Sequence, residues 1–431
     1  MELYNLVSLA GVLALLGFAL LLNPSPRRTN LRVVGWGLAV QLVLALFIFR
    51  VPAGRRFFLL INDAVVALLE PAAAGVRFVF GPLAKGPGEE GSLGFILAFQ
   101  GLPTIIFFSA LIAVLYHYRV MPLLLKVFAR FFTKTMRISG AESLCAASNI
   151  FVGVESAFTV RPHLAAMTRS ELCTVLTAGM ATVASNVLAV YVLLLRETFP
   201  TIAGHLVSAS FLSAPAALVM SKMLLPETGR PRTLGLSVAP HYEKHSNVFE
   251  AVIAGAQGGV KVIVGVVALL IAVLGLVALL DLLLKTLGNG IGPAIGLSGD
   301  WSLRAVLGVL FYPFTLAVGI PPADAGTLAG IIGERLVVTE LTAYEHLAVE
   351  MARGGLEHSR SGVIAAYALC GFAHVPSVAI FVGGISALAP SQTRSLSSVA
   401  FRALVAATLA CLLTAAVAGV FFSEGSILLG E

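Results

Sequence analysis

The sequence predicts an all-α integral membrane protein with about eight transmembrane helices and two re-entrant helical hairpins in an inverted repeat. First, the 431 residues are 58% hydrophobic and only 12% charged, whereas a soluble domain is about 25% charged. Second, apolar runs approach the roughly 20 residues that a helix needs to cross a bilayer. Third, a polar, interrupted segment occurs once in each half of the chain. The clearest apolar runs are 6–22, 33–49, 262–280 and 403–422.

The charge balance fits a membrane protein better than a nucleic-acid-binding one. The net charge is +6, but the basic residues stand at the ends of apolar runs, which is the positive-inside pattern of membrane topology. We therefore expect a multi-pass protein of the cell membrane, the inner membrane of a bacterium, with lipid and not nucleic acid as its surroundings. The first apolar run has no basic segment before it, so we interpret it as a retained helix and not a signal peptide.

The cysteines do not indicate a disulfide framework or a zinc site. They lie in apolar segments without paired spacing, and such cysteines are usually small buried residues. They are Cys145, Cys173, Cys370 and Cys411.

The N-terminal part should consist of three spanning helices and two helices at the membrane interface. Helices are expected over 4–22, 33–50 and 94–116. Residues 55–80 mix charged and apolar side chains, and 119–137 are basic and amphipathic, so both should lie at the interface.

Residues 138–168 are too polar for a lipid-facing helix and too apolar for a loop. A hairpin that enters and leaves the membrane on one side fits both facts, because irregular backbone at its tip is tolerated where protein or water covers it. Helices over 171–195 and 203–224 should follow, then a cytoplasmic polar stretch at 226–247 and a helix over 261–284.

Residues 303–350 repeat the polar interruption, and helices over 361–388 and 398–423 should follow them. The order of interrupted segment, helix, helix thus occurs twice, with one helix between the copies, so the second copy should be inverted. Paired interrupted segments of this kind indicate a transporter binding site. The repeat is one of pattern and not of residue identity.

The predicted division of the chain follows this repeat. Residues 1–117 should form N-terminal scaffold helices with an interfacial helix, and 118–224 a first transport repeat. Residues 225–300 should hold the polar loop and another scaffold helix, and 301–431 a second transport repeat.

Ionisable residues within membrane segments are costly and are candidates for function. Some could instead pair with one another or reach an interface. The two at the centres of the interrupted segments, Glu155 and Glu340, are the strongest candidates. The full set is Glu142, Glu155, Asp324, Arg335, Glu340 and His374.

Several motifs, in order, resemble the concentrative nucleoside transporters. The first interrupted segment contains Ser-Gly-Ala-Glu-Ser at 139–143, Ala-Ser-Asn-Ile-Phe-Val-Gly at 147–153 and Val-Arg-Pro at 160–162. The second contains Gly333-x-Arg335-x3-Thr339-Glu340, where the family has Gly-x-Lys-x3-Asn-Glu. Ala-Leu-Cys-Gly-Phe-Ala at 368–373 also matches, and the resemblance covers about 95–423.

The resemblance implies a homotrimer in which each protomer has a scaffold part and a transport part that moves like an elevator. Substrate would lie between the hairpin tips and the helices that follow them. Carried over residue by residue, the substrate-binding positions are Val154, Glu155, Val187, Thr339, Glu340, Phe372, His374 and Ser377.

Four of these positions depart from the family pattern, and one of them is Thr339, where the family has Asn. Val154 stands where the family has a base-reading Gln, and an apolar side chain cannot supply that amide's donor and acceptor. The segment up to Arg161 is one residue short, so Glu155 matches the family acid only if a Thr is deleted. His374 replaces a ribose-binding Asn, and it could be a ligand or a core histidine.

No organic cofactor is expected, and the coupling ion should be sodium, with a proton as the alternative. In the family the sodium site uses an asparagine, a hydroxyl and backbone carbonyls of an unwound turn, and neutral oxygens suit a hard cation. The matching positions are Asn149, Val152, Thr182 and Val183, with Asn186 as an additional polar group one turn on. Glu155 and His374 keep proton coupling open.

We therefore predict a cation-coupled symporter that takes up nucleosides. One alternative keeps the fold and changes the ligand to another nucleoside-like or polyol solute, which the loss of the Gln favours. A membrane-embedded enzyme would need a metal or paired-acid motif, and none is apparent. A non-transporting gate-type protein would not need polar residues at the hairpin tips.

Overall fold

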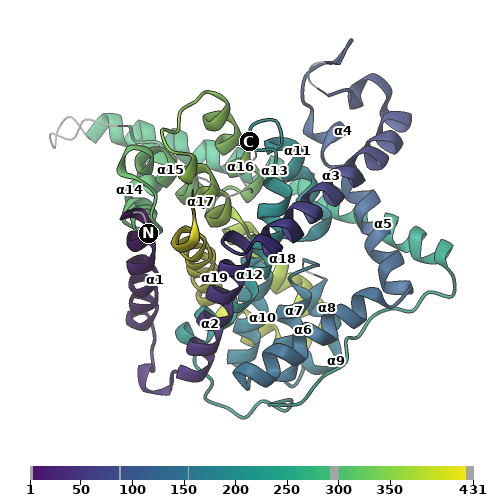
Figure 1. Ribbon diagram of the computed structural model, residues 1–431, viewed down its shortest axis with the longest axis vertical. Helices are drawn as coiled ribbons and strands as arrows, with labels where there is room; N and C mark the ends of the chain where they lie inside the picture. The colour runs from purple at the N-terminus through teal and green to yellow at the C-terminus, as the bar shows by residue number, and fades with distance from the viewer. Residues whose placement is uncertain (1–2, 87–88, 154, 292–299, 424–431) are drawn as a thin grey trace.

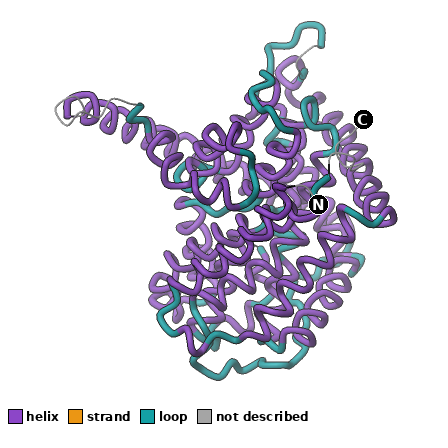
Figure 2. Tube along the Cα trace, turned by 60° about the vertical axis from the view of Figure 1, so that its left-hand side comes forward, coloured by secondary structure: helices purple, strands orange, loops and turns teal. Residues whose placement is uncertain are grey.

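A computed structural model describes residues 3–86, 89–153, 155–291 and 300–423, and almost all of its regular structure is helical (Figures 1 and 2). Within these ranges the β-structure is an isolated antiparallel bridge between Ser139 and Leu234. The helical prediction is confirmed. It follows from apolar composition, because a helix satisfies its own backbone hydrogen bonds where no water is available.

The N-terminal helices surround the repeats. α1 and α2 are apolar helices of 19 residues each, and α3 runs for 29 residues with a buried stripe along one face. The short α4 leads into α5, which packs along α13. Their bounds are Leu3–Leu21, Leu31–Phe49, Pro52–Phe80, Leu97–Gln100 and Thr104–His117.

The first interrupted segment is a helical hairpin followed by a broken helix. The amphipathic α6 precedes α7, which ends at Ser148, and the chain returns through α8 and α9. α10 and α11 then form one path interrupted at 182–184, and α12 follows. The bounds are Val120–Met136, Gly140–Ser148, Ser156–Thr159, Arg161–Leu164, Arg169–Ala181, Ser185–Leu195 and Ile202–Leu224.

The second interrupted segment has the same order of elements. α14 precedes a hairpin of α15 and α16 with its tip at 335–339, and α17 and α18 are separated by a break at 370–374 before α19. The bounds are Leu303–Ala317, Pro322–Glu334, Glu340–Ala352, Ser359–Leu369, Val375–Leu388 and Thr393–Phe421.

Four predicted boundaries were wrong. The helices predicted over 171–195 and 361–388 are each interrupted near the middle. The segment predicted over 303–350 contains a separate apolar helix, α14, before its hairpin. The helix predicted over 261–284 is α13, Val248–Ile291, whose 44 residues extend for about 66 Å at 1.5 Å per residue.

Eight candidate membrane spans occur in the described ranges by length and composition, which matches the predicted number but not every member. The stretch 52–84, expected at the interface, is long and apolar enough to cross, whereas 361–388 is not a single span because it is broken. The candidate spans are 3–21, 31–49, 52–84, 97–117, 169–195, 202–224, 248–290 and 390–421.

Local sequence signals set where helices of both repeats begin. Ser139 and Thr168 each accept the backbone N–H of a glutamate three residues on, and that glutamate's carboxylate accepts the N–H of the cap residue. Such capping boxes satisfy backbone donors that would otherwise be unpaired at a helix start. α18 begins at Val375, with Pro376 in its first turn, where a missing N–H costs nothing.

The centre of the molecule is formed by α10 and α12, in which almost every residue is buried, and by the part of α19 from Ala403 onward. α13 is the opposite, because none of its most apolar 18-residue window is buried. In Figure 1 α13 lies behind the other helices, and one of its faces contacts α5. Exposed leucine and valine along such a helix are suited to lipid or to another protein copy.

Candidate functional site

The two hairpin tips reach the two helix breaks, and this contact builds the site. At the first tip, the N–H of Ser185 donates to the carbonyl of Phe151 over 3.4 Å. At the second, the N–H of Val375 donates to the carbonyl of Leu336 over 2.9 Å. In each repeat a tip carbonyl therefore accepts the first N–H of the second half-helix.

Glycine permits the close approach at both breaks. A Cβ on Gly153 would lie 2.7 Å from the Cβ of Ala184. Gly371 has φ +136°, and its Cβ would lie 2.8 Å from the carbonyl carbon of Ala181. The first tip thus packs on the first break, and the two breaks pack on each other.

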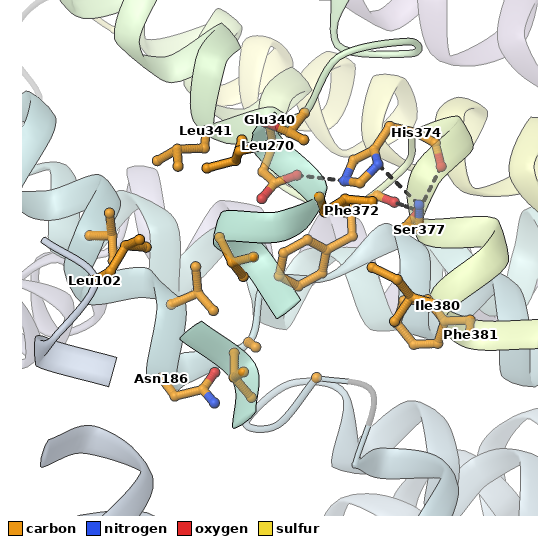
Figure 3. A pocket seen from close by; sticks show the side chains of 18 of the residues that line it. Leu102, Asn186, Leu270, Glu340, Leu341, Phe372, His374, Ser377, Ile380 and Phe381 are labelled. Atoms are coloured by element: carbon orange, nitrogen blue, oxygen red, sulfur yellow. Dashed lines mark hydrogen bonds and ion pairs between the residues drawn. The ribbon is translucent and has the colours of Figure 1, made fainter. Parts of the chain in front are cut away.

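A cavity lies where these elements meet, and both repeats contribute polar side chains to it (Figure 3). Glu155 comes from the first tip, Asn186 from α11, and Thr339 and Glu340 from the second tip. His374 and Ser377 come from the second break and α18. The apolar wall includes Leu102 near α5 and Val262 and Val266 of α13.

A hydrogen-bonded chain holds the carboxylate of Glu340 in this cavity. The hydroxyl of Tyr191 donates to Glu340 Oε1 over 2.6 Å. His374 Nε2 lies 2.7 Å from Glu340 Oε2, an ion-pair distance that is off the line of a hydrogen bond. His374 Nδ1 accepts the N–H of Ser377 over 3.2 Å, which assigns the proton of the neutral ring to Nε2. Dashed lines in Figure 3 mark the contacts of His374 with Glu340 and Ser377.

Glu340 is therefore a buried acceptor with defined neighbours and one open side. It is 5% exposed, and a carboxylate that leaves water needs hydrogen-bond donors in compensation. The Tyr191 hydroxyl supplies one of them, and the His374 ring lies at ion-pair distance from the other oxygen. The other side faces the cavity, where a ligand with hydroxyl or N–H groups could donate to it.

The predicted substrate positions meet in this one cavity. Glu155, Val187, Thr339, Glu340, Phe372, His374 and Ser377 all line it. Val154 lies outside the described residues. Their roles in binding stay predictions, although the geometry brings together residues that are up to 222 positions apart in sequence, from 155 to 377.

The predicted cation residues lie behind the first tip. Asn149 is fully buried, and its Nδ2 donates to the carbonyl of Cys145 over 2.9 Å. Its Oδ1 has no hydrogen-bond partner among the described residues. The hydroxyl of Thr182 donates to the carbonyl of Ala178 over 2.9 Å, which leaves its lone pairs available. Val183 is buried at the break.

Asn186 and Val152 belong to a second cavity that shares Glu155 and Asn186 with the first. It is lined by Ser109 and Tyr116 of α5, by Glu155 and by glycines of α13. Asn186 donates from Nδ2 to the hydroxyl of Ser109 over 3.4 Å, and its Oδ1 is unpartnered within the described part. Asn186 therefore contacts α5 as well as the main cavity.

Two of the other ionisable candidates have structural partners away from the cavity. Glu142 forms a buried ion pair with Lys222 of α12. Asp324 accepts the backbone N–H groups of Glu357 and His358 before α17, at 2.8 and 3.2 Å. Pairing of this kind is how membrane proteins accommodate charge away from water.

Sequence reasoning missed Tyr191 and the apolar wall of α13. Tyr191 is one aromatic residue in an apolar helix, and its hydroxyl could not be placed opposite Glu340 without the fold. Val262 and Val266 look like lipid-facing residues in the sequence, so no signal marked them. Within the described residues no cluster of histidine, cysteine and acidic side chains could hold a metal ion.

Comparisons with known proteins agree with this architecture over nearly the whole chain. Family models described as the N-terminus and C-terminus of Na+-dependent nucleoside transporters match residues 10–83 and 205–419, and a nucleoside-recognition model called Gate matches 98–198.

Individual relatives include both characterised and uncharacterised transporters. The nucleoside permease NupC of Helicobacter pylori is 32% identical, over 97% of this chain and 98% of the relative. An uncharacterised transporter of Bacillus subtilis, YutK, is 37% identical over 96% and 98%. Human solute carrier family 28 member 3 is 34% identical over 97% of this chain, which spans 60% of that relative.

The solved structures show the same fold. CNTnw in an inward-facing, substrate-bound state is 36% identical, with a TM-score of 0.86 over 97% of this chain and 98% of the other. A variant of that protein in an outward-facing state has a TM-score of 0.86 at 34% identity, over 97% of this chain and 98% of the other. These are structures of a transporter and not of an enzyme.

Proposed function

Because this chain belongs to the concentrative nucleoside transporters, a family of multi-pass proteins of the cell membrane, we propose that it takes up nucleosides by symport with sodium. The observation that carries the proposal is the cavity between the two hairpin tips, into which Glu340, Thr339 and Glu155 project from opposite repeats. Relatives named as a nucleoside permease and a sodium/nucleoside cotransporter support the substrate class and the ion.

Glu340 is the proposed ribose-binding residue. A ribose carries neighbouring hydroxyls, and a carboxylate can accept a hydrogen bond from each. Tyr191 and His374 fix the orientation of the carboxylate from behind, so less conformational entropy is lost on binding. Phe372 lies beneath His374 in the same cavity (Figure 3) and offers an aromatic face to a sugar or a base.

Sodium is the proposed coupling ion because the buried oxygens behind the first tip are neutral. Asn149 Oδ1 lacks a partner in the described residues. The Thr182 hydroxyl belongs to the helix break on which the first tip packs. The hydrogen bond from Ser185 to Phe151 joins these two segments. An ion bound there would stabilise the tip that closes over substrate, which couples ion binding to substrate binding.

The proposed movement is an elevator-like displacement of the two repeats against α5 and α13. The cavity supports this idea because its polar residues belong to the repeats, whereas Val262 and Val266 of α13 form a wall without hydrogen-bonding side chains. Exposed apolar side chains along α13 support its packing against other copies in a homotrimer as well as against lipid.

Uptake by purified protein in lipid vesicles tests the proposal. Labelled uridine, adenosine and inosine would be supplied with a sodium gradient or a proton gradient imposed separately. We expect uptake of at least one nucleoside under the sodium gradient and none above background without it. Uptake under the proton gradient alone would reject sodium coupling, and no uptake of any nucleoside would reject the substrate class in favour of another polyol-like solute.

A further inference from the structure

Arg335 and Asn149 occupy equivalent positions in the two repeats. Each is the first residue after the first hairpin helix, Arg335 after α15 and Asn149 after α7. The backbone N–H of each donates to the carbonyls two and four residues earlier. These are Gly333 and Ile331 for Arg335, and Ala147 and Cys145 for Asn149. The equivalence therefore rests on backbone geometry, although the side chains differ.

The surroundings of the two residues are equivalent as well. Thr182 follows the end of α10 at the first break, and Cys370 follows the end of α17 at the second; both have extended backbone. Arg335 Nη1 donates over 3.0 Å to the carbonyl of Ala368, in the last turn of α17. Two helix C-termini thus meet at each of these positions.

Where two helix C-termini converge, a positive charge is stabilising. The last carbonyls of a helix have no partner in the helix, and together they carry a partial negative charge. In a buried, membrane-embedded position water cannot screen this charge. At the first repeat the side chains of Asn149 and Thr182 offer neutral oxygens, so the proposed coupling cation would supply the positive charge.

At the second repeat the protein supplies the cation itself. The Arg335 side chain is fully buried, and its Nε and Nη2 have no hydrogen-bond partner among the described residues. No carboxylate in the described part of the chain lies within ion-pair distance of it. The acids near it in the sequence, such as Glu334 and Glu340, form ion pairs with other residues. A buried guanidinium without a counter-charge is costly unless carbonyl dipoles compensate it.

We infer that Arg335 is a built-in cation that compensates the converging helix C-termini at the second hairpin, as the coupling cation is proposed to do at the first. The inference rests on the proposed function for the first site. It explains why one repeat carries an arginine where the other carries an asparagine in the same backbone setting. The asymmetry makes one hairpin responsive to the ion, while the other keeps its charge throughout the cycle.

Chemical rescue tests the need for a cation at this place. Arg335→Ala leaves a guanidinium-sized space, so we expect uridine uptake to fall about tenfold or more and to recover several-fold when millimolar guanidinium is added. Arg335→Lys keeps the charge and should retain uptake. Arg394→Ala is the matched control, because Arg394 is an exposed residue at the start of α19. Uridine uptake by this variant should equal that of the wild type and should not change when guanidinium is added.

One further measurement separates this inference from the proposed function. The melting temperature of the purified Arg335→Ala protein should rise with guanidinium even if no nucleoside is transported, whereas that of the wild type should not. Wild-type uptake by Arg335→Ala without an added cation, loss of folding in Arg335→Lys, or a melting temperature of Arg335→Ala that guanidinium leaves unchanged would overturn the inference.

Discussion

At the scale of the residue, the account depends on a carboxylate that is held from one side and open on the other. Glu340 receives the Tyr191 hydroxyl and lies beside His374, and both of these come from other helices. A hydrogen bond to a charged group contributes about 1.5–3 kcal/mol. Each donor that orients Glu340, and each hydroxyl of a substrate that contacts it, should therefore have a measurable effect.

Glu340→Gln should abolish concentrative uptake while leaving the protein folded. Glutamine has nearly the same volume, but it brings an N–H2 group and no charge to a position that must accept hydrogen bonds. We expect uridine affinity to fall about tenfold to a hundredfold, which corresponds to the loss of a charged hydrogen bond. Equilibrium binding to purified protein measures it.

The control is Glu345→Gln, an exposed position on the same helix α16, which should bind uridine as the wild type does. Unchanged affinity of the Glu340→Gln protein would remove Glu340 from the site.

Tyr191→Phe should raise the KM for uridine by about tenfold with a smaller effect on the maximal rate. The substitution removes only the hydroxyl that donates to Glu340 over 2.6 Å, so the carboxylate loses one charged hydrogen bond and its fixed orientation. Concentration dependence of uptake under a constant sodium gradient separates the two parameters. A variant with wild-type KM would show that Tyr191 has a packing role only.

At the scale of the element, the important features are the interruptions and not the helices. The sequence predicted both hairpins because glutamate, asparagine and serine stand within apolar stretches at 138–168 and again near 340. The residue pattern alone did not predict the breaks in α10–α11 and α17–α18, since 182–184 and 370–374 are short stretches that a helix could also contain, and only the resemblance implied an unwound turn near Val183. Tertiary contact with the hairpin tips decides these backbones.

The breaks also explain why the cation residues could be proposed only by resemblance. Asn149 and Thr182 are 33 positions apart, and nothing in their spacing brings them together. The segments that carry them are brought together because Phe151 accepts a hydrogen bond from Ser185 and because Gly153 has no side chain. Backbone contact across two elements is not visible in a single sequence.

Gly371→Ala should destabilise the fold at the second break. A φ of +136° is unfavourable for alanine, and the new Cβ would lie 2.8 Å from Ala181, so we expect a loss of about 1–3 kcal/mol. Thermal unfolding in detergent would measure it. Gly383→Ala is the matched control, because nothing lies within 4 Å of its Cβ position in α18, and its melting temperature should stay the same or rise slightly.

At the scale of the whole molecule, the repeats form the polar part of the cavity and α13 forms an apolar wall opposite. The composition predicted membrane residence correctly, and the inverted order of elements predicted the two-repeat plan. Neither could show which face of α13 meets the cavity, since that helix is apolar on every side. Its packing against α5 decides the matter.

Val266→Trp should block uptake, whereas Val264→Trp should not. Val266 lines the cavity, so the indole would fill space that a nucleoside needs. Val264 is 62% exposed on another face of α13, where tryptophan can lie in lipid. Initial rates of uridine uptake at equal protein levels measure both variants. Equal rates for the two would mean that substrate does not pass along this wall.

The most direct test is a structure of the protein in lipid nanodiscs with uridine and sodium bound. The account predicts nucleoside density in the cavity between residues 151–155 and 335–340, with the ribose hydroxyls within hydrogen-bonding distance of Glu340 and an ion beside Asn149. Nucleoside bound elsewhere, or a cavity whose two tips are separated by lipid or by an uninterrupted helix, would contradict it.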